Sequence, residues 1–195
     1  MAGANLELSS SQTSVPHSSA ITTQHSAALE PGTSEYYSLQ QAVLEAGKTF
    51  LVHGGRVVDL RCDGGRWISS LIQWACGNCQ FIALDDTQES VQECIDQHKM
   101  CVHLGFVEAG LMDLNERFPE TASVLTLSVG SMSRLQAERK GEVLRSIRRH
   151  LERGGAFIMM ERADRDWETE LREAGFREIR RIWRRGAFIA WLALR

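Results

Sequence analysis

The sequence has no long apolar segment and no basic residue near its start. No apolar run approaches the roughly 20 residues that span a bilayer, and the first Lys or Arg is Lys48. The opening is therefore unlike a signal or transit peptide, and we expect a cytoplasmic protein that makes no membrane contact. Cysteine is also scarce, with five residues in a chain long enough to fold without cross-links. An odd number of thiols fits a reducing compartment better than a disulfide framework.

Aromatic residues and periodic apolar positions are missing from the first 34 residues. This segment holds twelve Ser and Thr and two of the three prolines of the chain. Such a composition cannot bury enough apolar surface to form a core. We therefore predict a disordered tail over residues 1–34 and one domain over residues 35–195. With 43% hydrophobic content in 195 residues, the chain has enough apolar material for one complete core.

From Glu35 onward, helical and strand patterns alternate. The predicted helices cover 35–50, 67–75, a stretch from about 87, 134–151 and 167–174, and the predicted strands cover 56–60, 80–84, 102–107, 122–129, 156–160, 176–183 and 187–194. This alternation predicts an α/β fold with a seven-stranded, mostly parallel sheet and helices on both faces. The short Arg185-Gly186 turn predicts a closing antiparallel hairpin. Its apolar second strand suits the interior of the sheet. Its first strand suits an edge, because five arginines lie within it or directly after it, namely Arg177, Arg180, Arg181, Arg184 and Arg185.

The stretch from Arg56 to Gly65, R-V-V-D-L-R-C-D-G-G, is the predicted ligand loop. Asp59 ends an apolar strand, and Gly64-Gly65 permits a sharp turn before the next helix. Open α/β sheets bind ligands at the carboxyl ends of their strands. Asp85 lies 20 residues after Gly65 at the end of the next strand, where an acid can accept both hydroxyls of a ribose. The loop lacks the patterns G-x-G-x-x-G and G-K-[ST], so a cofactor with a ribose but no phosphate fits better than NAD or ATP.

The order of elements, the closing hairpin and the motifs D-L-x-C-x-G-G and A-L-D-D-T together resemble the class I S-adenosylmethionine-dependent methyltransferases. The resemblance covers about residues 35–195. Within this superfamily, the stretch from Leu127 to Glu161 looks most like the carboxy-S-adenosylmethionine synthase group. The resemblance implies a Rossmann-like fold, S-adenosylmethionine as cofactor, and methyl transfer to an unidentified acceptor, either a small molecule or RNA.

The resemblance also implies a role for each motif residue. Asp59 would help to position the methionine part of the cofactor, Asp85 would hold the ribose hydroxyls, and Ser128 would face the transferred group. The other implied contacts are Cys62, Asp63, Gly64 and Gly65 along the methionine part, and Asp86 and Thr87 beside the adenine.

The chain departs from the family pattern in this loop. The family usually has glycine where this chain has Arg61 and Asp63, and an acid on the adenine amino group where this chain has Gly110. Arg61 could fill the methionine subsite, which would leave a catalytically inactive module that serves as a binding or assembly partner. Alternatively, Arg61 could pair with the methionine carboxylate while Asp63 meets the amino group.

No general base stands out in the sequence. Glu161 ends the fifth strand at the cofactor edge, but it could equally cap the following helix. Tyr36 or Tyr37 could face the ligand, although packing in the core explains either residue as well.

Two further patterns each have a functional and a purely structural interpretation. Cys76, Cys79, His98 and Cys101, with His103 close behind, could form a structural zinc site at the amino edge of the sheet, or could simply be turn residues. A redox role for Cys76 and Cys79 is less favoured, because their C-x-x-C closes a helix instead of opening one.

Residues 134–195 hold 16 Lys and Arg against 10 Asp and Glu. This excess of positive charge could attract RNA, or it could reflect solvated helix faces.

Overall fold

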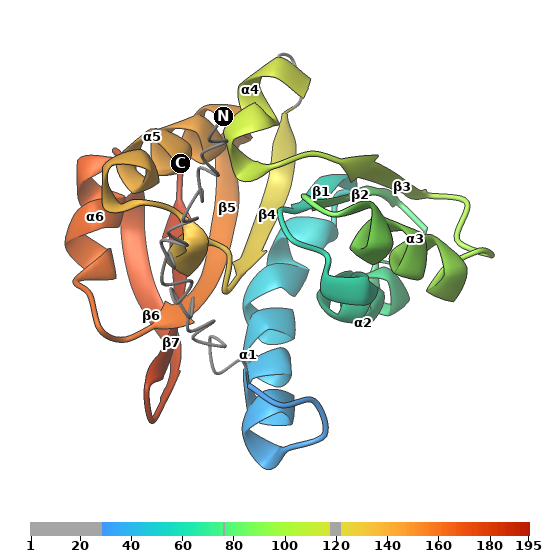
Figure 1. The fold of residues 1–195 in the computed structure, drawn as a ribbon, viewed down its shortest axis with the longest axis horizontal. Coiled ribbons are helices and arrows are strands. Elements are labelled where there is room, and N and C mark those ends of the chain that lie inside the picture. The colour runs from blue at the N-terminus through green and yellow to red at the C-terminus, as the bar shows by residue number, and fades with distance from the viewer. Residues whose placement is uncertain (1–28, 76, 118–121) are drawn as a thin grey trace, which may run out of the picture.

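A seven-stranded sheet in the order β3-β2-β1-β4-β5-β7-β6 forms the centre of the structure (Figure 1). The structure is a computed structural model that describes residues 29–75, 77–117 and 122–195. The strands are β1 (Gly55–Asp59), β2 (Cys79–Asp85), β3 (Leu104–Glu108), β4 (Ser123–Val129), β5 (Leu151–Arg162), β6 (Arg177–Arg185) and β7 (Phe188–Leu194). The helices are α1 (Ser34–Leu51), α2 (Arg66–Trp74), α3 (Gln88–Gln97), α4 (Leu114–Arg117), α5 (Ala137–His150) and α6 (Trp167–Glu173), with 3-10 segments η1 (Asp63–Gly65), η2 (Leu111–Asp113) and η3 (Met132–Arg134).

The strand directions confirm the predicted α/β architecture. Strands β3, β2, β1, β4 and β5 pair in parallel, whereas β7 runs antiparallel to both β5 and β6. Strand β7 is buried between its two neighbours, and the arginine-rich β6 forms the edge, as predicted. An apolar strand gains most where both faces are covered, and charged side chains keep an edge from pairing with other chains.

Helices cover both faces of the sheet and separate the buried apolar side chains into two clusters. Helices α1, α2 and α3 pack on one face, through residues that include Leu39, Val43, Trp67, Leu71 and Cys94. Helices α4, α5 and α6 pack on the other face, through residues that include Leu114, Leu144, Ile147, Trp167 and Leu171. None of the helices in the described ranges is long and apolar enough to cross a membrane.

Many boundaries differ from the sequence-based prediction by one or more residues; helix α5, predicted over 134–151, covers Ala137–His150. Strand β3 begins at Leu104, because Val102 lies in the preceding turn and is 87% exposed. Strand β5 begins at Leu151, where it pairs with Ser123 ahead of a register shift. Helix α1 begins at Ser34, because the Thr33 side chain accepts a hydrogen bond from the N–H of Tyr36 and caps the helix. The predicted disorder of the N-terminal tail concerns mainly residues 1–28, which lie outside the described residues.

Candidate functional site

Asp59 ends β1 with a fully buried carboxyl group. Its Oδ1 accepts a hydrogen bond from the backbone N–H of Arg61 at 3.2 Å, whereas its Oδ2 has no partner. Burial, together with the nearby carboxylates of Asp85 and Asp63, raises the pKa of Asp59 to about 8, against the opposite effect of the Arg61 hydrogen bond. A buried carboxyl oxygen without a partner destabilises the fold, so this oxygen is suited to receive a donor from a ligand.

The glycine turn after β1 has the conformation that the sequence predicted. Gly64 and Gly65 have φ angles of 70° and 79°, which L side chains rarely adopt. A Cβ atom on Gly65 would lie 2.5 Å from Cε1 of His98 and 2.9 Å from Sγ of Cys94. The turn therefore needs glycine both for its backbone angle and for its close approach to α3.

Asp85 connects this turn to β2. Its Oδ1 accepts hydrogen bonds from the N–H and the Oγ1–H of Thr87, at 3.3 and 3.1 Å. Its Oδ2 faces the N–H of Asp63 at 3.4 Å and the Sγ of Cys62 at 3.9 Å. The hydroxyl oxygen of Thr87 in turn caps α3 through the N–H of Ser90. The two contacts of Oδ2 are long, so a ligand hydroxyl could replace them at little cost.

The Cys62 thiol is fully buried beneath the turn. A hydrogen bond with Cys94 and burial both raise the pKa of Cys62, so this thiol is a packing residue of the turn and a poor nucleophile.

Two hollows lie at the carboxyl edge of the sheet. The larger, of about 1050 Å³, is lined by Leu29, Glu30, Pro31, Tyr36, Arg61, Asp63, Arg66, Trp67, Val129, Gly130, Ser133, Arg134, Met160, Glu161, Arg162, Asp164 and Phe188. The smaller, of about 130 Å³, is lined by Leu60, Arg61, Asp86, Ala109, Leu111, Ser131, Arg134 and Leu135. Arg61 and Arg134 border both hollows and therefore mark their junction. One guanidinium nitrogen of Arg61 donates to the backbone oxygen of Gly130 at 3.3 Å.

The structure places the predicted contacts at different depths. Asp86 lies on the wall of the smaller hollow, where leucine and alanine side chains could pack against a flat ring. Asp59 and Asp85 lie beneath the surface and line neither hollow. Ser128 is fully buried and its Oγ lies 2.5 Å from the Oγ of Ser131. Beyond Ser128, Val129 and Gly130 form the wall of the larger hollow.

Glu161 stabilises η3 and does not cap the helix that follows it. Its two carboxylate oxygens accept hydrogen bonds from the N–H groups of Met132, at 2.7 Å, and Ser133, at 3.2 Å, whereas α6 is capped by Asp166. Burial raises the pKa of Glu161 to about 7, although these hydrogen bonds act in the opposite direction. A carboxyl group with a pKa near neutrality at a cavity wall can exchange a proton with a bound molecule.

Of the two tyrosines at the start of α1, Tyr36 faces the larger hollow. Its ring packs against Trp67, with centroids 5.3 Å apart, and both rings line the wall. Tyr37 is 60% exposed and is absent from the lining of both hollows.

Sequence analysis missed a hydrogen-bonded chain between α2 and the end of α3. The Ser69 hydroxyl lies 2.5 Å from the backbone oxygen of Gly65 and 2.6 Å from Nε2 of His98. Nδ1 of His98 lies 3.0 Å from the backbone oxygen of Cys94. His98 therefore packs against the glycine turn, and its predicted position at the amino edge of the sheet is wrong. No sequence signal indicates this contact, because Ser69 lies on α2 and His98 lies 29 positions later, at the C-cap of α3.

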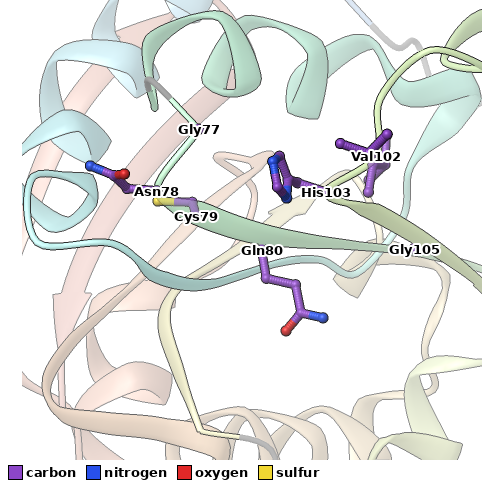
Figure 2. Close-up of a pocket in the computed structure, with 8 residues that line it drawn as sticks. Gly77, Asn78, Cys79, Gln80, Val102, His103 and Gly105 are labelled. Carbon is purple, nitrogen blue, oxygen red and sulfur yellow. The ribbon is translucent and has the colours of Figure 1, made fainter.

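Of the other zinc candidates, Cys79 and His103 line a separate hollow of about 420 Å³ at the amino edge, whereas Cys101 does not line it. Figure 2 shows the side chains of His103 and Gln80 on opposite sides of the strands. The Cys79 thiol is buried and lies 3.7 Å from the backbone oxygen of Leu51. Within the described parts of the chain, no three His, Cys, Asp or Glu side chains are grouped as metal ligands. Cys76 lies outside the described residues.

No protein-family model matches the sequence, and no curated protein is similar to it. Solved structures do resemble the fold. An O-methyltransferase family protein from Burkholderia thailandensis superposes with a TM-score of 0.66 and 15% identity over 80% of this chain and 56% of its own. NodS, an N-methyltransferase from Bradyrhizobium japonicum solved with S-adenosyl-L-homocysteine, superposes with a TM-score of 0.68 and 10% identity over 84% of this chain and 89% of its own. The cyclase SpnF superposes with a TM-score of 0.59 and 18% identity over 79% of this chain and 63% of its own.

These similarities define the fold as the Rossmann-like fold of class I methyltransferases. The chain spans about half the length of the Burkholderia protein. Because one fold supports several chemistries, as the cyclase illustrates, the reaction must be argued from the site.

Proposed function

We propose that this chain binds S-adenosylmethionine across the junction of the two hollows and transfers its methyl group to an acceptor in the larger one. The observation that carries the proposal is the unpartnered Oδ2 of Asp59, fully buried at the carboxyl end of β1 beside a glycine turn. Ligands of open α/β sheets bind at this edge, and NodS, which has the same fold, was solved with S-adenosyl-L-homocysteine.

The residues present suit the parts of this cofactor. Because Asp59 and Asp85 lie beneath the surface and line neither hollow, binding requires the loop 61–65 to shift. Oδ2 of Asp59 then accepts a hydrogen bond from the ammonium group of the methionine part, and Asp85 exchanges its long contacts with the turn for the ribose hydroxyls. The smaller hollow, with Asp86 on its wall, receives the adenine. When bound, the cofactor supplies an electrophilic methyl group on a sulfonium. The protein supplies alignment of the acceptor and exclusion of water.

We propose a small molecule as the acceptor. The larger hollow is a recess and carries the aromatic side chains of Tyr36, Trp67 and Phe188 on its wall. A concave site lined by apolar rings and a few polar groups is typical of small-molecule binding.

One observation favours a second function, a methyltransferase-like module without catalysis that serves as a binding or assembly partner. The guanidinium of Arg61 bonds to the backbone oxygen of Gly130 at the junction of the hollows, where the family usually has a glycine. If Arg61 stays in this place, it excludes the methionine part of the cofactor.

Titration calorimetry with S-adenosylmethionine separates the two functions. For the enzyme, we expect micromolar affinity in the wild type and a loss of roughly 100-fold in Asp85→Ala, because the ribose loses hydrogen bonds to a carboxylate. Asp96→Ala is the matched control, because this exposed carboxylate on α3 pairs with Lys99 just after the helix, and its loss should leave the affinity unchanged. No heat from the wild type at millimolar ligand, together with measurable binding by Arg61→Gly, would identify the inactive module.

A further inference from the structure

Four arginines line the larger hollow, and they differ in their partners. Arg66 pairs with Asp63 and Arg162 pairs with Asp164, each with N–O distances of 3.6 Å. Arg61 and Arg134 form no ion pair with any carboxylate in the described parts of the chain. The guanidinium of Arg61 donates to the backbone oxygen of Gly130, and the backbone N–H of Arg134 donates to the backbone oxygen of Ser131.

Arg61, which is half-buried, and Arg134, which is exposed, line both hollows. Any ligand that extends from the smaller hollow into the larger one therefore passes both residues. Asp86 lies on the wall of the smaller hollow but forms no ion pair with either arginine. Glu161, on the wall of the larger hollow, is occupied by the N–H groups of Met132 and Ser133. Glu30 also lines the larger hollow, but within the described residues neither Arg61 nor Arg134 is within ion-pair distance of a carboxylate.

We propose that Arg61 and Arg134 form an anion clamp that binds a carboxylate group at the junction of the two hollows. A guanidinium presents two parallel N–H donors that match a carboxylate, and a charge-assisted pair of this kind gives both affinity and orientation. Replacing the contact to the neutral oxygen of Gly130 by a carboxylate strengthens the hydrogen bonding of Arg61. The contact of Arg61 with Gly130 is then the resting position of the clamp.

The carboxylate has two possible sources. It is either the methionine carboxylate of the cofactor, in which case the clamp rests on the proposed function, or a carboxylate of the acceptor. Both sources share the same chemistry, and different probes distinguish them.

The cofactor arm compares S-adenosylhomocysteine with 5′-methylthioadenosine, which lacks the amino acid part. By calorimetry, we expect Arg61→Gln and Arg134→Gln to bind S-adenosylhomocysteine at least about 10-fold more weakly than the wild type. Their affinity for 5′-methylthioadenosine should not change. Arg162→Gln is the control, because this arginine lines the same hollow but is already paired. An equal loss for both nucleosides would overturn the cofactor as the source.

The acceptor arm uses benzoate and its uncharged isostere benzamide, without a nucleoside. If the acceptor supplies the carboxylate, benzoate should raise the Tm of the wild type more than benzamide does, and Arg61→Gln or Arg134→Gln should abolish the difference. The baseline Tm of each variant shows that it is folded.

The two arms keep the clamp and the proposed function distinguishable. If the wild type binds neither nucleoside, the proposed function fails, while the benzoate comparison still tests the clamp. The clamp itself is overturned if both variants bind S-adenosylhomocysteine like the wild type and benzoate stabilises the wild type no more than benzamide.

Discussion

Asp59 is the residue at which ligand binding and stability conflict most directly. Burial raises its pKa to about 8, from an ordinary value of 3.8, and leaves Oδ2 without a partner. The folded state therefore holds a proton that the unfolded chain loses near pH 4. It follows that the free energy of unfolding falls as pH rises from about 4 to about 8.

We expect Asp59→Asn to remove this pH dependence, because the amide does not ionise. The Tm of the variant should be close to that of the wild type near pH 4 and should exceed it increasingly up to about pH 8, by roughly 2–4 °C for each kcal/mol of stability that the wild type loses. Thermal unfolding followed by circular dichroism over this range measures the difference. Asp96→Asn serves as the control, since the hydrogen bond with Lys99 lowers the pKa of Asp96. Parallel curves for wild type and Asp59→Asn would contradict the buried, protonated carboxyl.

The same residue predicts a proton release on binding. In the free protein, Asp59 is mostly protonated at pH 7, and an ammonium group beside Oδ2 would lower its pKa. Binding of S-adenosylhomocysteine at pH 7 should therefore release up to about one proton. Calorimetry in buffers of different ionisation enthalpy measures this number. Heats that do not depend on the buffer would place the ammonium group away from Asp59.

At the scale of elements, the glycine turn η1 and helix α3 form one unit. Gly65 has φ 79° and lies against Cys94 and His98, whereas Gly186 in the β6–β7 turn has φ 53° and open space around its Cα. Gly186→Ala should lower the free energy of unfolding by about 1 kcal/mol, because only the left-handed backbone opposes a side chain there. Gly65→Ala should cost roughly 2–4 kcal/mol more, because its Cβ would also displace α3. Urea unfolding of both variants measures the comparison, and equal costs would show that α3 yields easily.

At the scale of the whole molecule, positive charge is concentrated in the C-terminal third. Strand β6 carries exposed arginines along the edge of the sheet, although Arg185 pairs with Glu35 of α1. If the acceptor is RNA, this edge is the expected contact surface.

The RNA alternative predicts salt-dependent binding. Four phosphate contacts from Arg177, Arg180, Arg181 and Arg184 would give a slope of log K against log salt near −3 for a single strand. Arg181→Gln combined with Arg184→Gln should make the slope less steep by roughly 1.4. The control is Arg56→Gln with Lys99→Gln, which removes the same charge at the β1–β3 side of the sheet. Fluorescence anisotropy with a short oligonucleotide measures the slopes, and no binding at low salt would exclude RNA as the acceptor.

The sequence by itself determined the succession of the seven strands along the chain, the mostly parallel sheet and the places of the last two strands. Apolar runs that end in acids predict buried parallel strands, and the contrast between β7 and the arginine-rich β6 predicts which of them lies inside. Asp59, Gly64 and Gly65 could be placed because a strand end and a left-handed turn depend on residues next to them in the chain.

Only the tertiary structure decided what the side chains of the site contact. The guanidinium of Arg61 donates to Gly130, which lies 69 positions later in the chain. The carboxylate of Glu161 accepts a hydrogen bond from Ser133 in η3, 28 positions earlier. His98 packs against Ser69, 29 positions earlier. Such contacts depend on how the loops approach one another once the sheet has formed. Local periodicity carries no information about that approach, so the junction of the two hollows, where function is decided, could not be predicted from the sequence.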